Sequence, residues 1–281
     1  MGNLIIAGVR HVLPGLDIAT WEDDPLLTLA PEDGSYRPDD TVIDLITTHT
    51  TSGEGPQILR PGRGPGGTHA ERVVRYWTTS KTKKGDKTTA GAQLILDYDA
   101  SWVQTCDLRR RAAFHAGCKT NPGVNGRSIG IEIAINARGE LYEGQMESYV
   151  AMMDALSRLF DVPREYAAGV WPIPNLVDQN FPGCIGHRDV GNRGVFDPGP
   201  IPYTYLRRAG YLPTNVQAGE HIARWKERQS ALNAQAIAAG LPVLKVDGIR
   251  GPKTQAYARR FKGPIGQWVD RPGDDVAILT Q

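Results

Sequence analysis

Two uninterrupted apolar runs, both rich in β-branched residues, most constrain what this chain can fold into. The first, TVIDLITTHTT at residues 41–51, lies between a Pro-Asp-Asp turn and a Gly/Pro-rich loop, and the second, SIGIEIAI, occupies residues 128–135. Runs of this length bounded by turn-forming residues are typical of strands buried in a sheet. Between them, GAQLILDYDASWVQTCDL predicts a hairpin that turns at residues 97–100.

An amphipathic helix is predicted after these strands, at residues 144–160. Its apolar side chains recur at helical spacing, so they form one face that must pack on the sheet; they are Met146, Tyr149, Val150, Met153, Leu156 and Phe160. Shorter helices are predicted near residues 70–77 and 204–209, and a further strand at 184–187. The predicted fold class is therefore α/β, with a central mixed β-sheet flanked by helices.

The chain divides into three predicted parts, which its 281 residues are long enough to hold. Residues 1–40 are rich in Pro, Asp and Gly and predict an irregular arm. Residues 41–212 contain the strands and the long helix and form the main domain. Residues 213–281 follow a Pro-Thr-Asn break and predict a small helical domain, because apolar residues recur there at helical spacing, at Ile222, Trp225, Leu232 and Ala236.

Composition excludes some partners. The formal net charge of +1 gives no basic surface for a nucleic-acid backbone, so we expect no nucleic-acid partner. Residues 213–281 carry ten Lys/Arg against six Asp/Glu, a charge of +4 that suits an anionic cell wall but is also ordinary for a solvated face. The apolar run Leu4–Val9 is too short for a signal peptide or a membrane span, which predicts synthesis in the cytoplasm and no membrane insertion.

The three cysteines do not form a recognisable framework. Cys106, Cys118 and Cys184 cannot all pair, and they lack the CxxC spacing of a structural zinc site. We expect free buried thiols, with a Cys106–Cys118 disulfide as the alternative.

Two histidines and an aspartate suggest a metal site. His49 ends the first predicted strand, His187 ends the strand at 184–187, and Asp197 follows ten residues later in an Asp-Pro-Gly turn that Pro198 restricts. Catalytic zinc sites use three such ligands and leave a fourth position open for water. Taken singly, each histidine is also explained as a hydrogen-bonded side chain at a strand end. Cys184 is a poor substitute ligand, because residues i and i+3 of a strand face opposite sides.

Four sequence blocks together indicate a family. LITTHTT, FHAG, SIGIEI and GHRDV followed by DPGP occur in an order that resembles the zinc-dependent N-acetylmuramoyl-L-alanine amidases, a group shared with phage endolysins and peptidoglycan-recognition proteins. The resemblance spans residues 41–210. It implies a Zn²⁺ ion held by His49, His187 and Asp197, with Glu132 as the general base on the zinc-bound water. An outward-facing strand carboxylate is the alternative for Glu132.

The resemblance also suggests substrate contacts. It places His115 of the FHAG block along the substrate groove, where a wall position with no catalytic part is equally open, and we assign Asn125 and Arg193 to substrate contact as well. Many relatives carry a lysine two residues before the aspartate, poised to stabilise the oxyanion, and here Val195 stands there. Either zinc itself then carries more of the oxyanion charge, or Arg193 from the same loop replaces the lysine.

A second resemblance lies in the C-terminal part. LKVDGIRGPKTQAYARRFK looks like the DGxxGxxT core of a three-helix peptidoglycan-binding module, although a helical cap on the main domain would explain it too. Together the resemblances imply a monomeric peptidoglycan hydrolase of endolysin type, made in the cytoplasm of a host bacterium and released to its cell wall. A peptidoglycan-recognition protein without catalysis, and a zinc peptidase that cuts the stem peptide, remain the alternatives.

Overall fold

The computed structural model divides the chain into two units, Met1–Glu220 and His221–Gln281. The structure describes residues 2–51, 68–79, 90–116, 123–135, 141, 143–168, 173, 176, 180–190, 197–216, 218–249 and 252–261. Among the helices in these ranges, none is long and apolar enough to span a bilayer.

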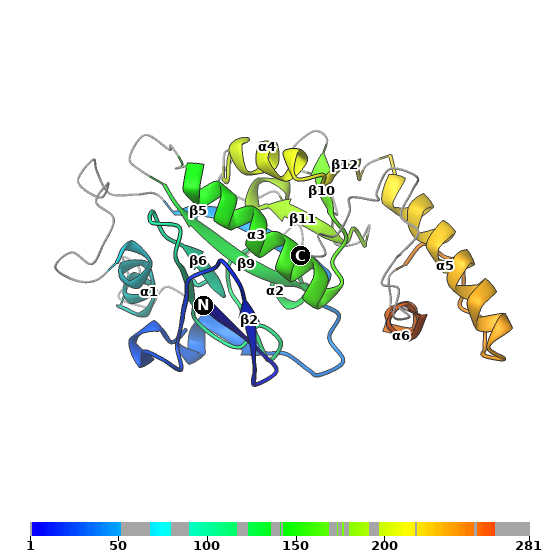
Figure 1. The fold of residues 1–281 in the computed structure, drawn as a ribbon, viewed down its shortest axis with the longest axis horizontal. Coiled ribbons are helices and arrows are strands. Elements are labelled where there is room, and N and C mark those ends of the chain that lie inside the picture. The colour runs from blue at the N-terminus through cyan, green and yellow to red at the C-terminus, as the bar shows by residue number, and fades with distance from the viewer. Residues whose placement is uncertain are drawn as a thin grey trace. The chain divides into compact units, whose positions relative to one another are not determined.

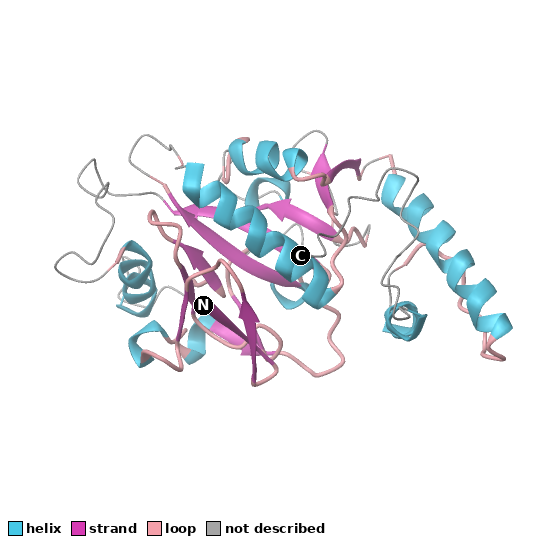
Figure 2. Ribbon diagram, viewed as in Figure 1, coloured by secondary structure: helices cyan, strands magenta, loops and turns pink. Residues whose placement is uncertain are grey.

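The first unit is built on an eight-stranded sheet (Figure 2). Adjacent strands are parallel except for the predicted hairpin, in which β6 and β7 are antiparallel, so the sheet is mixed as predicted. In spatial order the strands are β12 (Leu212–Asn215), β10 (Glu165–Ala168), β11 (Gly183–Gly186), β5 (Leu45–Thr51), β9 (Ser128–Ala134), β6 (Leu94–Leu96), β7 (Trp102–Gln104) and β3 (Ile18–Thr20).

Helices cover both faces of this sheet, which explains why its central strands are largely apolar or β-branched. The predicted helix is α3 (Glu143–Phe160), and it lies across one face, with α4 (Ile201–Arg208) beside it (Figure 1). Their side chains share a core with alternate residues of the strands, such as Ile46 and Ile131. On the opposite face α1 (His69–Thr79) packs on β6 and β7, and Val124 of α2 (Val124–Arg127) packs near β5 and β11.

The N-terminal forty residues are more regular than the predicted arm. They form an antiparallel hairpin of β1 (Gly2–Ile6) and β2 (Val9–Leu13), followed by β3, two short 3-10 helices and β4 (Gly34–Tyr36), which pairs with β8 (Arg111–Ala113). Because β3 pairs with β7, this segment is part of the main sheet. Its strands are three to five residues long and two of them pair with strands far along the chain, so local periodicity does not reveal them.

Residues 213–215, the predicted domain boundary, are instead part of β12, which pairs in parallel with β10. The two units divide later, between Glu220 and His221. Pro213 fits this strand because β12 lies at the edge of the sheet, where a missing N–H group is tolerated. A local Pro-Thr-Asn signal therefore resembles a linker although the sheet continues through it.

The second unit contains α5 (Glu220–Ala238) and α6 (Pro252–Phe261) within its described residues. Leu232 and Leu244 form a small core with Tyr257 and Phe261. Both polar atoms of the Gln229 side chain on α5 bind the Asp-Gly turn. The amide nitrogen donates to Asp247 Oδ1, and the amide oxygen accepts from the backbone N–H groups of residues 247 and 248. The predicted third helix is not seen in the described ranges.

Two of the three cysteines confirm the prediction of free buried thiols. Cys106 and Cys184 are buried and unpaired, and burial raises the pKa of the Cys106 thiol to about 11. Such thiols stay protonated at neutral pH. Cys118 lies outside the described residues.

Candidate metal centre

The candidate site lies at the carboxyl ends of three neighbouring parallel strands. In the register of β5 and β9, His49 pairs with Glu132, and in the register of β11 and β5, Gly186 pairs with Thr48, so that His187 directly follows at the level of His49. Three residues that are far apart in sequence thus form one row across the sheet. Strand pairing alone brings the candidate general base and two candidate ligands together.

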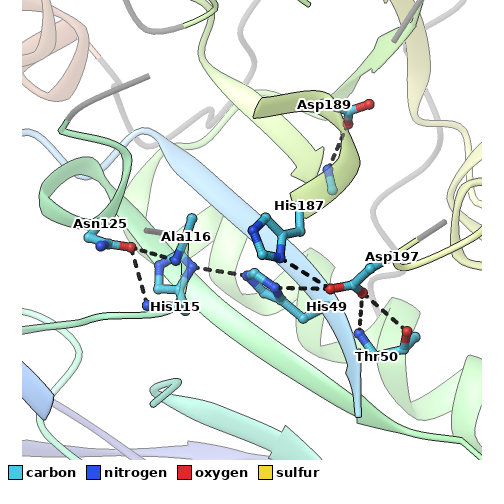
Figure 3. A network of polar contacts seen from close by, with 9 residues as sticks. His49, Thr50, His115, Ala116, Asn125, His187, Asp189 and Asp197 are labelled. Carbon is cyan, nitrogen blue, oxygen red and sulfur yellow. Dashed lines mark hydrogen bonds and ion pairs between the residues drawn. The ribbon is translucent and has the colours of Figure 1, made fainter. Parts of the chain in front are cut away.

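The third candidate ligand reaches this row from the loop after β11. Asp197 Oδ2 lies 3.4 Å from His49 Nδ1 and 3.3 Å from His187 Nδ1, as Figure 3 shows. The ligand atoms of all three residues lie within 4.8 Å of one another, and within the described residues they are the only group of three such side chains that could hold a metal ion. The residues predicted to bind zinc therefore converge.

Asp197 is held so that only one of its oxygens faces the histidines. Its Oδ1 accepts hydrogen bonds from the backbone N–H of Thr50, at 2.5 Å, and from the Thr50 hydroxyl, at 3.1 Å. Burial opposes ionisation of this carboxyl group, but the nearby imidazoles of His187 and His49 and the backbone N–H of Thr50 outweigh it and lower the pKa of Asp197. The carboxylate is therefore charged and presents Oδ2 to the site.

The turn that carries Asp197 packs closely on the end of β11. A Cβ atom added to Gly186 would lie 2.5 Å from Pro198 Cδ and would also collide with the hydroxyl of Tyr203. Only glycine leaves room for Pro198 at this point. The glycine before His187 thus allows the Asp-Pro turn to approach that histidine.

The spacing of the donor atoms fits a zinc ion. With bonds of about 2.0–2.1 Å and tetrahedral angles, two ligands of one zinc ion are separated by about 3.3 Å. The two separations that involve Asp197 are 3.3 and 3.4 Å. Burial lowers the pKa of His49 despite the attraction of Asp197, which favours the neutral imidazole that a metal needs. Two imidazole nitrogens and one carboxylate oxygen are also a common donor set of catalytic zinc.

Glu132 lies on the same face of the sheet as this group. Ile131 and Ile133 pack toward α3, so the side chain between them points to the opposite face, where His49 lies. It is partly buried, and burial together with the charge of Asp197 raises the pKa of Glu132 well above its ordinary value. This setting does not match an outward-facing carboxylate on the protein surface.

The ring of His115 contacts that of His49. Its Nδ1 is 3.1 Å from His49 Nε2, its Nε2 is 2.8 Å from Ser128 Oγ, and it is 9% exposed. The ring therefore contacts a candidate ligand, and its contact with substrate stays a prediction. The sequence block FHAG marks the position of His115 but carries no information on the direction of its side chain.

The substrate contacts assigned to the other two residues, Asn125 and Arg193, stay predictions. Asn125 Oδ1 accepts from the backbone N–H groups of His115 and Ala116, at 3.2 and 2.8 Å, so this amide oxygen shapes the chain around His115. Arg193 and Val195 lie outside the described residues. The group that stabilises the oxyanion is accordingly not assigned.

Two further polar or thiol side chains of the central strands do not take part in the candidate ligand set. Cys184 packs in the core with residues of α3 and is not among the converging ligand atoms. Gln93, at the start of the predicted hairpin, is buried, and its side-chain oxygen accepts from the backbone N–H of Gly130 at 2.7 Å. It supports the sheet and does not reach into the site through that oxygen.

Sequence reasoning missed three residues around the site. Thr50 binds Asp197, and Ser128 binds His115. His69 begins α1, and its Nε2 lies 3.0 Å from the hydroxyl of Thr51 at the end of β5. The strand-end position of Thr50, next to His49, was the one available signal for it. For Ser128 and His69 the contact depends on the fold.

Known proteins similar to this chain are found among solved structures, whereas no curated protein matches the sequence. The similar structures include the amidase LysC from Clostridium intestinale, with 15% identity and a TM-score of 0.41 over 70% of this chain and 98% of that chain. AmpD has 20% identity and a TM-score of 0.42 over 70% and 95% of the two chains, and the Drosophila peptidoglycan recognition protein SA has 11% and 0.45 over 71% and 95%.

The sequence also matches a protein family over much of its length. Residues 39–200 match the family described as N-acetylmuramoyl-L-alanine amidase, a stretch that covers more than half of the 281 residues. It contains β5, β9 and β11 together with His49, Glu132, His187 and Asp197. This protein therefore belongs to the N-acetylmuramoyl-L-alanine amidase family.

Proposed function

We propose that this protein is a zinc-dependent amidase that cleaves the bond between the lactyl carbonyl of N-acetylmuramic acid and L-alanine in peptidoglycan. The observation that carries the proposal is the convergence of His49, His187 and Asp197 beside Glu132. Membership of the amidase family supports it, although the family match alone does not distinguish a hydrolase from a protein that only binds peptidoglycan.

Each side chain has a defined part in this reaction. His49 Nδ1, His187 Nδ1 and Asp197 Oδ2 would hold the metal ion. When bound in such a site, zinc lowers the pKa of a coordinated water to about 7 and polarises a carbonyl group. Glu132 accepts the proton of the attacking water and delivers it to the departing amine of L-alanine. Its raised pKa brings the carboxyl group closer to neutral pH, where one group can both accept and return a proton.

We further propose that the protein is a monomeric endolysin of a phage or prophage, made in the host cytoplasm and released to the cell wall. The second unit would anchor it to the wall. The Asp-Gly turn held by Gln229 supports this, because it orders the segment that resembles a peptidoglycan-binding module. A second weak site on an insoluble polymer makes later encounters effectively intramolecular.

Digestion of purified cell wall, with and without a chelator, tests the proposed reaction. Mass analysis should find free stem peptides that begin with L-alanine, and the chelator should abolish their release. Fragments cut inside the stem peptide would show a peptidase instead. Intact wall that retains the protein would show a binding protein, and would contradict the proposed catalysis.

A further inference from the structure

A chain of hydrogen bonds continues from the candidate zinc site into the interior of the protein. His49 Nε2 lies 3.1 Å from His115 Nδ1, and His115 Nε2 lies 2.8 Å from Ser128 Oγ. The hydroxyl of Ser128 in turn lies 2.7 Å from the carbonyl oxygen of Val124. His49 and His115 are 2% and 9% exposed and Ser128 is fully buried, so protein groups define the polarity of this chain of bonds.

The end of the chain fixes the direction of every bond in it. A carbonyl oxygen can only accept, so the single hydroxyl proton of Ser128 is donated to Val124. Ser128 Oγ must then accept from His115 Nε2, which places the proton of a neutral His115 on Nε2 and leaves Nδ1 as an acceptor. His115 Nδ1 therefore accepts a hydrogen bond from His49 Nε2–H.

This direction determines which nitrogen of His49 is free. With its proton on Nε2, the neutral imidazole of His49 has its lone pair on Nδ1, the atom that faces Asp197 Oδ2 at 3.4 Å. The reverse direction would place the proton on Nδ1 and leave no lone pair for a metal. Only one arrangement of protons in the chain of bonds matches a zinc ligand.

The protein holds His115 in place by packing and by backbone contacts. A Cβ atom added to Gly130 on β9 would lie 2.5 Å from the His115 ring, so the imidazole rests directly on the backbone of that strand. Asn125 Oδ1 accepts from the backbone N–H groups of His115 and Ala116, as Figure 3 shows. Strand β9 thus supports the ring of His115, and Asn125 holds the main chain of that residue.

We infer that His115 is a positioning residue: together with Ser128 it holds His49 in the tautomer that offers Nδ1 to zinc, before the metal binds. The inference rests on the proposed zinc site. Groups that orient metal-binding histidines commonly change metal affinity about 10- to 100-fold when they are removed. Nothing in this role requires His115 to contact the substrate.

Zinc affinity of the full-length variants, measured by competition with a chelating dye, tests the inference. His115→Phe keeps a flat ring against Gly130 but cannot accept from His49, so it should weaken zinc binding about 10- to 100-fold. His115→Asn retains an acceptor near the position of Nδ1 and should recover most of the affinity. Ser157→Ala removes a buried hydroxyl that contacts Tyr211, away from the site, and should bind zinc as the wild type does.

A second measurement needs no variant that alters folding. Long-range proton–nitrogen spectra of the zinc-free wild type, with labelled histidine and at a pH well above the usual histidine pKa, report the tautomer directly. We expect both His49 and His115 to carry their proton on Nε2. The zinc-free state is the informative one because zinc would itself impose this tautomer on His49.

The outcomes separate this inference from the proposed function. A wild type that does not bind zinc would contradict the proposed function. A wild type that binds zinc, together with a folded His115→Phe variant of equal affinity, would overturn the positioning role alone. So would a zinc-free His49 that carries its proton on Nδ1.

Discussion

Replacing Asp197 by asparagine should remove a zinc ligand although the side chain keeps its shape. In the wild type Oδ1 accepts from the backbone N–H of Thr50, and Oδ2 faces the two histidines. The N–H of Thr50 needs an acceptor, so in the Asp197→Asn variant the amide oxygen of the new side chain takes the place of Oδ1. Its NH₂ group must then face His49 and His187, and an NH₂ group has no lone pair for a metal.

The size of the effect follows from the number of ligands. Zinc bound by four protein ligands contributes about 10–16 kcal/mol, or roughly 2.5–4 kcal/mol per ligand. At about 1.4 kcal/mol per factor of ten, loss of the carboxylate should weaken zinc binding by roughly 100- to 1000-fold. The assay is competition of the purified full-length protein with a chelator of known zinc affinity, combined with metal analysis after dialysis.

A matched variant controls for the loss of one carboxylate charge. Asp154 lies on α3, across the sheet from the site, where it accepts from Tyr211 and pairs with Arg164. Asp154→Asn should therefore bind zinc as tightly as the wild type. If a folded Asp197→Asn variant also keeps the wild-type affinity, Asp197 is not a ligand and the reasoning about its two oxygens fails.

Three further variants test other parts of the site and the fold. Glu132→Gln should retain zinc but lose activity by about 10²- to 10⁴-fold, the usual contribution of general acid–base catalysis, and an active variant in a wall-digestion assay would remove Glu132 from the mechanism. Ser128→Ala deprives His115 Nε2 of its acceptor, so its zinc affinity should fall by about tenfold; an unchanged affinity would mean that His115 needs no partner. Arg37→Met should lower the free energy of unfolding by at least about 3 kcal/mol, because the buried guanidinium donates to four backbone carbonyls. Arg10 forms an exposed ion pair, so Arg10→Met should lower the free energy of unfolding far less in the same denaturant titration. Equal costs would show that the Arg37 contacts do not stabilise the fold.

The central elements were predictable because each has a strong local signal. The strands β5 and β9 are rich in apolar and β-branched residues, and the helix α3 repeats its apolar residues at helical spacing. The observed helix, Glu143–Phe160, begins one residue before the predicted one. Period and composition thus identify elements that are buried on a whole face, since burial dictates their residue types.

The N-terminal segment and β12 were not predictable in the same way. Arg37 is fully buried and holds its segment through carbonyls of residues 108, 125, 126 and 128, all of them distant in sequence. An arginine in a Pro- and Asp-rich stretch indicates a solvated loop to any local criterion. Contacts of this kind depend on a fold that other segments create first.

For the candidate site, the sequence located the residues better than it assigned their roles. His49 and His187 were expected at strand ends, and the structure places them in one row because β5 and β11 are neighbours. For His115 the sequence offered a position but no direction. A histidine in a loop can point to substrate or to another side chain, and only the distances to His49 and Ser128 distinguish the two.

The position of His49 in the sheet also explains why this ligand needs His115 as a hydrogen-bond partner. His49 lies on β5, between β11 and β9, so its backbone is fixed by pairing on both sides. Strand pairing sets the position of the ring but leaves open which nitrogen carries the proton. The bonds through His115 and Ser128 supply that choice from the side of the ring opposite Asp197. The sheet therefore determines where the imidazole of His49 lies, and the buried hydrogen bonds determine which of its nitrogens carries the proton.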